Sequence, residues 1–185
     1  MKELVLSESA IQAIVSRLGK ELTEELSKEE RPPVIVGVMR GALPFYHDLI
    51  RQIHVEFYCD YLSLSSYEGG MSSTGKVHMA QDLTLDVKDR TIVVVEDIID
   101  TGYSMQFLLE HLKKKGPKRI LVCALFNKKK ARVVDVPVDY VGYELKDSKF
   151  LVGYGLDYQQ MQRNVPYVYV PTEEEIKRLD ELAAK

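Results

Sequence analysis

One stretch, residues 91–104 (TIVVVEDIIDTGYS), constrains the fold of this 185-residue chain more than any other. The five residues from Thr91 to Val95 are all β-branched, which favours a strand buried on both faces. Two carboxylates, Glu96 and Asp97, follow directly, and from Met105 the apolar residues recur at helical spacing. The stretch therefore predicts a strand, a loop and a helix. Its loop is expected at the carboxyl end of a parallel strand, where open α/β sheets bind ligands.

The residue types in this loop suit a phosphorylated sugar. Backbone amides and hydroxyl groups over 101–104 can surround a phosphate at the start of the helix, where the helix dipole favours an anion. Gly102 lets the backbone come close to such a ligand. Glu96 and Asp97 cannot bind phosphate directly, but they suit ribose hydroxyl groups or a hard cation such as Mg²⁺. The alternative, a capped helix preceded by solvated carboxylates, explains one acidic residue but not the whole pattern.

Length and composition indicate an ordinary globular protein. A chain of 185 residues predicts one domain, residues 1–185. The net charge of −3 gives no electrostatic reason to expect nucleic acid or an anionic membrane, and no segment resembles a signal peptide or a membrane span. Cys59 and Cys123 fit buried free thiols in a reducing cytosol. We therefore expect a cytoplasmic protein without a nucleic-acid or membrane partner.

Periodic apolar patterns predict alternating strands and helices along the rest of the chain. Further strands are expected at 34–39, 55–61, 76–80, 119–126 and 138–143. Further helices are expected from Ser7 to near Ser27, over 42–51, and after Thr172, where a capping box occurs. The polar segment 65–75 is long for a loop in a compact domain, which is typical of a functional lid or of disorder.

The segment VVVEDIIDTGYS resembles the phosphoribosyl-pyrophosphate (PRPP) motif of type I phosphoribosyltransferases, in the form found in their hypoxanthine-guanine branch. A second segment, FLVGYGLDY at residues 150–158, is similar to another motif of that family. The resemblance spans about 34–170. It implies an α/β fold of the type I phosphoribosyltransferase class, with a central, mostly parallel sheet flanked by helices. A small hood from the N-terminal and C-terminal segments and a flexible lid hairpin, with its loop at about 65–75, complete that fold.

The resemblance also implies an activity in purine salvage: Mg²⁺-dependent transfer of the 5-phosphoribosyl group from PRPP to hypoxanthine and/or guanine. The products are IMP or GMP and pyrophosphate, and the family is commonly a homodimer or homotetramer. PRPP or nucleotide binding is implied for Glu96, Asp97, Asp100, Thr101, Gly102, Tyr103 and Ser104. Pyrophosphate binding is implied for Arg163 and for the turn Met39-Arg40-Gly41, which in the family often has a non-proline cis peptide.

The remaining implied roles concern the purine, the metal and the lid. The purine-binding residues are Ile98, Lys128, Phe150, Leu151 and Asp157. The Mg²⁺ ligands are Glu96, Asp97 and Asp157. Ser66 and Tyr67 are expected to close over the site, which would keep water from a glycosyl cation. The pattern alone would place Phe150 in the core, and Lys129 is the nearest alternative to Lys128.

The expected chemistry assigns distinct tasks to Asp100 and Lys128. A purine nitrogen must lose a proton as it attacks, and Asp100 is the candidate base. An ammonium group has only donors, so Lys128 suits a 6-oxo group and disfavours the 6-amino group of adenine. One alternative is a regulator of the same fold that binds PRPP without catalysis. Another is a flavodoxin-like signalling domain with Asp97 as phosphoacceptor, but it explains neither the hydroxyl-rich loop nor the GYGLDY segment.

Overall fold

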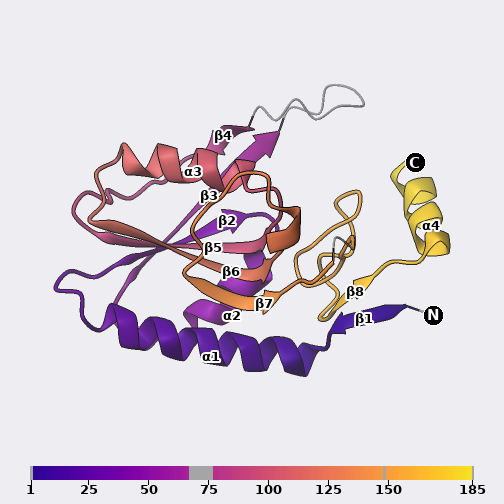
Figure 1. Ribbon diagram of the computed structural model, residues 1–185, viewed down its shortest axis with the longest axis horizontal. Helices are drawn as coiled ribbons and strands as arrows, with labels where there is room; N and C mark the ends of the chain where they lie inside the picture. Colours follow the sequence, from indigo (N-terminus) through magenta and orange to yellow (C-terminus); the bar gives the residue numbers. More distant parts are fainter. Residues whose placement is uncertain (1, 67–76, 148, 185) are drawn as a thin grey trace.

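A six-stranded sheet forms the centre of the computed structural model, which describes residues 2–66, 77–147 and 149–184 (Figure 1). The strand order is β4-β3-β2-β5-β6-β7, and only the β3–β4 pair is antiparallel. The expected mostly parallel sheet is therefore confirmed. The strands are β2 (Val34–Met39), β3 (Tyr58–Ser66), β4 (Val77–Gln81), β5 (Thr91–Ile99), β6 (Arg119–Asn127) and β7 (Tyr140–Glu144).

Helices cover both faces of this sheet (Figure 1). Helices α1 (Glu8–Leu26) and α2 (Leu43–Ile50) cover one face, and α3 (Tyr103–Lys113) covers the other. Because successive side chains of a strand point to opposite faces, Val93 and Val95 pack in the cluster of α1 and α2, whereas Ile92 and Val94 pack in that of α3. The prediction that this strand is buried on both faces is confirmed.

A second, two-stranded sheet joins the N-terminal and C-terminal segments, which are the segments expected to form the hood. Strand β1 (Glu3–Leu6) pairs antiparallel with β8 (Val168–Val170), and α4 (Glu173–Ala183) follows β8 (Figure 1). The side chain of Thr172 accepts from the Glu175 amide at 3.3 Å, so the predicted N-cap is confirmed. The Glu175 side chain accepts from Lys2 and Tyr169 instead of from the Thr172 amide, so the capping box is only half formed. Strands β1 and β8 were not predicted, because four and three residues are too few to show a period.

Strand β5 is longer than predicted, and this changes the place of the acidic pair. Its pairing with β6 continues to Ile99, opposite Asn127, so Glu96 and Asp97 lie in the strand rather than in the loop after it. Cys123 is buried as expected, but Cys59 is exposed, which corrects that expectation. Ser66 ends β3, while Tyr67 and most of the predicted lid loop lie outside the described residues. Within the described ranges, no helix has the length and apolarity to cross a membrane.

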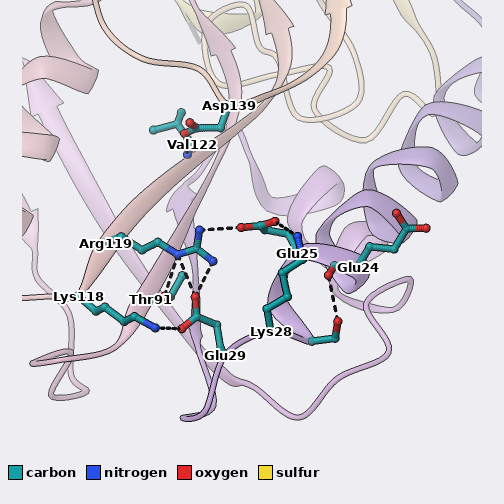
Figure 2. Close-up of polar contacts among 10 residues, drawn as sticks. Glu24, Glu25, Lys28, Glu29, Thr91, Lys118, Arg119, Val122 and Asp139 are labelled. Carbon is teal, nitrogen blue, oxygen red and sulfur yellow. Dashed lines mark hydrogen bonds and ion pairs between the residues drawn. The ribbon is translucent and has the colours of Figure 1, made fainter.

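The amino edge of the sheet carries a cluster of paired charges (Figure 2). Arg119, at the start of β6, contacts Glu25 and Glu29, and Lys118 donates to Glu29 at 2.7 Å. Burial opposes the ionisation of Glu29, but hydrogen bonds from Lys118, Thr91 and Arg119 outweigh it and lower its pKa to about 2. The charges at this edge therefore stabilise one another.

Candidate active site

The register of two neighbouring strands brings Asp100 and Lys128 together at the carboxyl edge of the sheet. Ile99 of β5 is opposite Asn127 of β6, so Asp100 and Lys128 are the next residues on either strand. Lys128 Nζ lies 3.1 Å from Asp100 Oδ2, and the Lys128 amide donates to the Ile99 carbonyl at 3.0 Å. The Lys128 side chain is 8% exposed and that of Asp100 is 48% exposed. Lys129, the alternative, is exposed at the start of a short 3₁₀ turn.

Arg132 fastens the Asp100 loop to the segment that carries Lys128, a role that sequence reasoning missed. Its guanidinium donates to the carbonyl of Asp100 at 3.2 Å, to the carbonyl of Val136 at 3.4 Å and to the side chain of Asn127. The carbonyl of Thr101 accepts two further amides from the same segment. A basic run usually forms a solvated face, so nothing in the sequence distinguished Arg132 from its neighbours.

The start of α3 presents a pocket toward the same edge. Gly102 is the N-cap with a φ of +95°, and no side chain among the described residues caps this helix, whereas Ser7 and Thr172 cap α1 and α4. Such an N-terminus favours an anion. The pocket is lined by Glu96, Ile98, Ile99, Asp100, Thr101, Gly102, Ser104 and Met105, while the next predicted residue, Tyr103, is exposed.

A second structural feature, which was not predicted, requires glycine at position 102. A Cβ atom at this position would lie 2.3 Å from the carbonyl oxygen of Val134. The positive φ and this close approach both require glycine. Gly102 therefore lets the loop at 100–104 pack closely against the segment that contains Arg132 and Val134.

The adjacent carboxylates of β5 lie in different surroundings. Glu96 lines the pocket at the start of α3, whereas Asp97 is 8% exposed and lies against Gly41. Burial raises the pKa of both carboxyl groups, and the charge of Asp97 raises that of Glu96 further. Among the residues that the structure describes, neither carboxylate makes an ion pair. The pair is therefore costly to keep ionised in the free protein.

The turn after β2 approaches Asp97 and the GYG segment closely. The Met39–Arg40 peptide bond is cis, as the resemblance implies. A Cβ atom on Gly41 would lie 1.9 Å from Asp97 Oδ2, and one on Gly155 would lie 2.0 Å from the Gly41 carbonyl oxygen. Glycine is required at both positions by these contacts. Gly41, Asp97 and Gly155 thus meet at one place, although they lie far apart in the sequence.

Arg163 and Asp157 are paired with each other beside this turn. Their charged groups are 2.7 Å apart, and Arg163 also donates to the Gly155 carbonyl at 2.6 Å and to Gln160 at 2.9 Å. Arg40 reaches the same Gln160 oxygen at 3.3 Å. Arg163 Nε is buried without a hydrogen-bond partner among the described residues. Arg40 and Arg163, the two arginines predicted to bind pyrophosphate, therefore both donate to the side chain of Gln160. Asp157 forms an ion pair with Arg163.

Phe150 lies on the surface rather than in the core. It is 51% exposed and meets Tyr158 edge to face, with ring centroids 5.9 Å apart. Leu151 is 5% exposed and belongs to the core cluster that Ile98 also packs against. The pattern-based alternative for Phe150 is therefore wrong, and the ring is free to meet a planar ligand.

The donor set at this edge suits a cation that brings other ligands with it. The described residues contain no group of three or more histidine, cysteine or carboxylate side chains that could hold a metal ion. Mg²⁺ usually binds through one or two carboxylates together with water and substrate phosphates. Glu96 and Asp97 could supply the carboxylates of such a site, with the remaining ligands coming from water and substrate.

The sequence matches a known family over most of its length. The model of the phosphoribosyl transferase domain matches residues 5–159. The chain is 39% identical to a hypoxanthine phosphoribosyltransferase of Salmonella typhimurium strain LT2 over 166 residues, 90% of this chain and 93% of the relative. It is also 39% identical to a hypoxanthine-guanine phosphoribosyltransferase of Bacillus subtilis strain 168 over 170 residues, 92% of this chain and 93% of that relative.

Solved structures show the same architecture. A hypoxanthine phosphoribosyltransferase from Staphylococcus aureus superposes with a TM-score of 0.86 at 35% identity, covering 93% of this chain and 92% of the other. A hypoxanthine-guanine phosphoribosyltransferase from Bacillus anthracis gives 0.85 at 34% identity, covering 93% and 99%. The predicted fold class is therefore confirmed.

Proposed function

Because the chain belongs to the phosphoribosyltransferase family, we propose that it transfers the 5-phosphoribosyl group of PRPP to hypoxanthine and/or guanine. IMP or GMP and pyrophosphate are the products. The observation that carries this proposal is the contact of Lys128 with Asp100, beside the uncapped start of α3. A buried ammonium next to a half-exposed carboxylate offers a purine both a donor for its 6-oxo group and an acceptor for the proton it loses.

The sugar phosphate of PRPP would occupy the pocket at the start of α3. The amides and hydroxyl groups of Thr101, Tyr103 and Ser104, with Gly102 between them, would hold the 5-phosphate. Displacement at the anomeric carbon passes through an oxocarbenium-like state, as in glycoside hydrolysis. The carboxylate of Glu96, which lines this pocket, and that of Asp97, which lies against Gly41, would stabilise the developing positive charge more than the ground state.

The diphosphate of PRPP would lie between the Met39-Arg40-Gly41 turn and Arg163. Both arginines already reach the same Gln160 oxygen, and Arg163 Nε has an unused donor. A bound Mg²⁺ ion would supply charge neutralisation for the leaving group. Glu96 and Asp97, with Asp157 if it leaves Arg163, are the residues that would hold the ion.

The purine would lie between the Lys128 side and Phe150. The exposed ring of Phe150 can stack on the base, with Ile98 and Leu151 beside it. We place the reading of the 6-oxo group on Lys128 rather than Lys129, because Lys128 is the buried neighbour of Asp100. We further propose a cytoplasmic homodimer or homotetramer with no nucleic-acid or membrane partner. Ser66 and Tyr67 would close over the site.

An absorbance assay with PRPP and Mg²⁺ tests this proposal against hypoxanthine, guanine, xanthine and adenine in parallel. We expect turnover of hypoxanthine or guanine and none of adenine. Turnover of adenine alone would contradict the role of Lys128. PRPP binding without turnover of any base would instead identify a regulator that keeps the fold.

A further inference from the structure

The turn at residues 153–155 has an unusual backbone that its surroundings must impose. Gly153, Tyr154 and Gly155 have φ angles of +102°, +47° and +97°. Glycine adopts the left-handed region freely, but the region disfavours a bulky side chain such as that of tyrosine. Such a conformation persists where neighbouring contacts over-determine it, and these places cluster at functional sites.

A single side-chain hydrogen bond ties the middle of this turn to helix α2. The Tyr154 hydroxyl donates to Asp48 Oδ2 at 2.7 Å, and the Tyr154 residue is only 7% exposed. Gln12 of α1 donates to the same oxygen at 2.8 Å. Burial acts to raise the pKa of Asp48, but hydrogen bonds from Tyr154, Gln12 and His47 outweigh it and lower the pKa. The acceptor is therefore an ionised carboxylate, which makes the stronger kind of hydrogen bond.

The next residue of the turn reaches the part of the site assigned to the diphosphate. Gly155 packs so closely on Gly41 that a Cβ atom would lie 2.0 Å from the Gly41 carbonyl oxygen. Its own carbonyl accepts from Arg163 Nη1 at 2.6 Å. A shift of the turn would therefore move Arg163 and release Gly41. Lys128 lies on another segment. Phe150 precedes the turn, from which the buried residue Val152, paired with Tyr169 of β8, separates it. Both side chains would therefore keep their places.

We propose that Asp48 and Tyr154 are positioning residues whose hydrogen bond holds Gly155 and Arg163 against the Gly41 turn, so that the diphosphate side of the site is preformed. This inference rests on the proposed function. Neither residue needs to touch PRPP for this. Because the pair acts on one side of the site, its loss weakens PRPP binding and spares purine binding.

Paired variants with steady-state kinetics test the proposal. Tyr154→Phe and Asp48→Ala each remove the bond, and we expect each to raise the KM for PRPP about tenfold, within the range for a hydrogen bond to a charged group. The KM for the purine and kcat should stay within about threefold of wild type. The double variant should be no worse than either single one, and Asp48→Asn, which keeps an oxygen acceptor, should restore most of the affinity.

Tyr46→Phe is the matched control, because Tyr46 is a buried tyrosine of α2 whose hydroxyl donates to the Ile35 carbonyl at 3.2 Å. It should lower Tm as much as Tyr154→Phe but leave the KM for PRPP unchanged. Equal kinetic effects of both substitutions, or a fall in Tm alone for Tyr154→Phe, would overturn the proposal.

Calorimetric titration with PRPP and Mg²⁺ in the absence of purine separates this inference from the proposed function. If wild type binds PRPP but turns over no base, the function fails and the dissociation constants still decide the role of the pair. A wild-type chain without PRPP affinity overturns both.

Discussion

The two edges of the central sheet both carry poorly exposed carboxylates, but they treat them in opposite ways. At the amino edge, Glu29 meets Lys118, Arg119 and Thr91, and its pKa falls to about 2. At the carboxyl edge, burial raises the pKa of Glu96 and Asp97, and no cation in the described part of the chain pairs with them. Unpaired buried charge is destabilising. The carboxylate at the amino edge therefore stabilises the fold, whereas the two at the carboxyl edge destabilise it. Carboxyl groups with strongly shifted pKa values are typical of functional sites.

The largest expected effect of a substitution is at Asp100, on the carboxyl edge. Asp100→Asn removes the proposed base with little change in shape, so we expect kcat to fall about 10²–10⁴-fold while PRPP affinity changes less than about threefold. Steady-state kinetics and PRPP titration measure the two effects. Glu110→Gln, the same chemical change on the exposed side of α3, should alter neither. A rate unchanged by Asp100→Asn would remove Asp100 as the base.

Lys128 and Lys129, a buried and an exposed lysine at the carboxyl edge, can be compared by the same substitution. Lys128→Ala removes a buried donor beside Asp100, and we expect the KM for hypoxanthine or guanine to rise about 10–100-fold as discrimination against adenine weakens. Lys129→Ala removes an exposed lysine and should change the KM less than about twofold. Base-competition assays compare the variants. The reverse order of effects would move the role to Lys129.

At the amino edge, loss of Glu29 should affect stability and not activity. The pKa of Glu29 falls from 4.5 to about 2 on folding, so its contribution is complete above pH 4.5 and is lost as pH falls toward 2. The full shift corresponds to about 3 kcal/mol, and we reduce this to about 1–2 kcal/mol because the paired cations are 34% and 55% exposed.

Urea unfolding of wild type and Glu29→Gln across this pH range measures the contribution. Glu29→Gln should be less stable by that amount at pH 7 and equal to wild type near pH 2, with unchanged kcat. Glu30→Gln, at an exposed neighbouring glutamate, is the control. A stability difference that persists at pH 2 would mean that packing rather than charge is responsible.

The smallest expected effect is that of Glu96→Gln, which should raise the stability of the protein instead of lowering it. Glu96→Gln removes a charge that burial and Asp97 both disfavour, while its side chain can still accept from the Asp97 amide. We expect the free energy of unfolding to rise by about 1 kcal/mol at pH 7, and kcat/KM for PRPP to fall. Calorimetry and kinetics on the same preparation measure the two changes. A destabilised variant would contradict the view that the carboxyl edge is strained by its charges.

Patterns local to one segment could be read from the sequence, and contacts between segments could not. The β-branched run at 91–95 and the capping residues Ser7 and Thr172 predict their elements because burial and capping act over a few residues. The end of β5 at Ile99 was missed because only its pairing with β6 extends it. The motif residues Asp100 and Lys128 were identified through family resemblance, but their contact depends on strand register.

Residues that support the site left almost no signal in the sequence. Arg132 lies in a basic run like any surface run, and its bonds to Asp100, Asn127 and Val136 depend on the fold. Tyr154 lies between two glycines, but only the structure shows its left-handed backbone and its bond to Asp48. Tertiary contacts decide these roles, and no local period reports them.

The pairing of β1 with β8 has a consequence for the order of events during synthesis. Strand β1 precedes every strand of the central sheet along the chain, whereas its partner β8 follows all of them. The central sheet contains neither strand, so it can assemble while the hood is still open. The segment with Phe150 and Tyr154 lies between β7 and β8, and Val152 within it pairs with Tyr169 of β8, so its final position depends on β8. During synthesis, the proposed phosphate loop can therefore form before the proposed purine and diphosphate sites are complete.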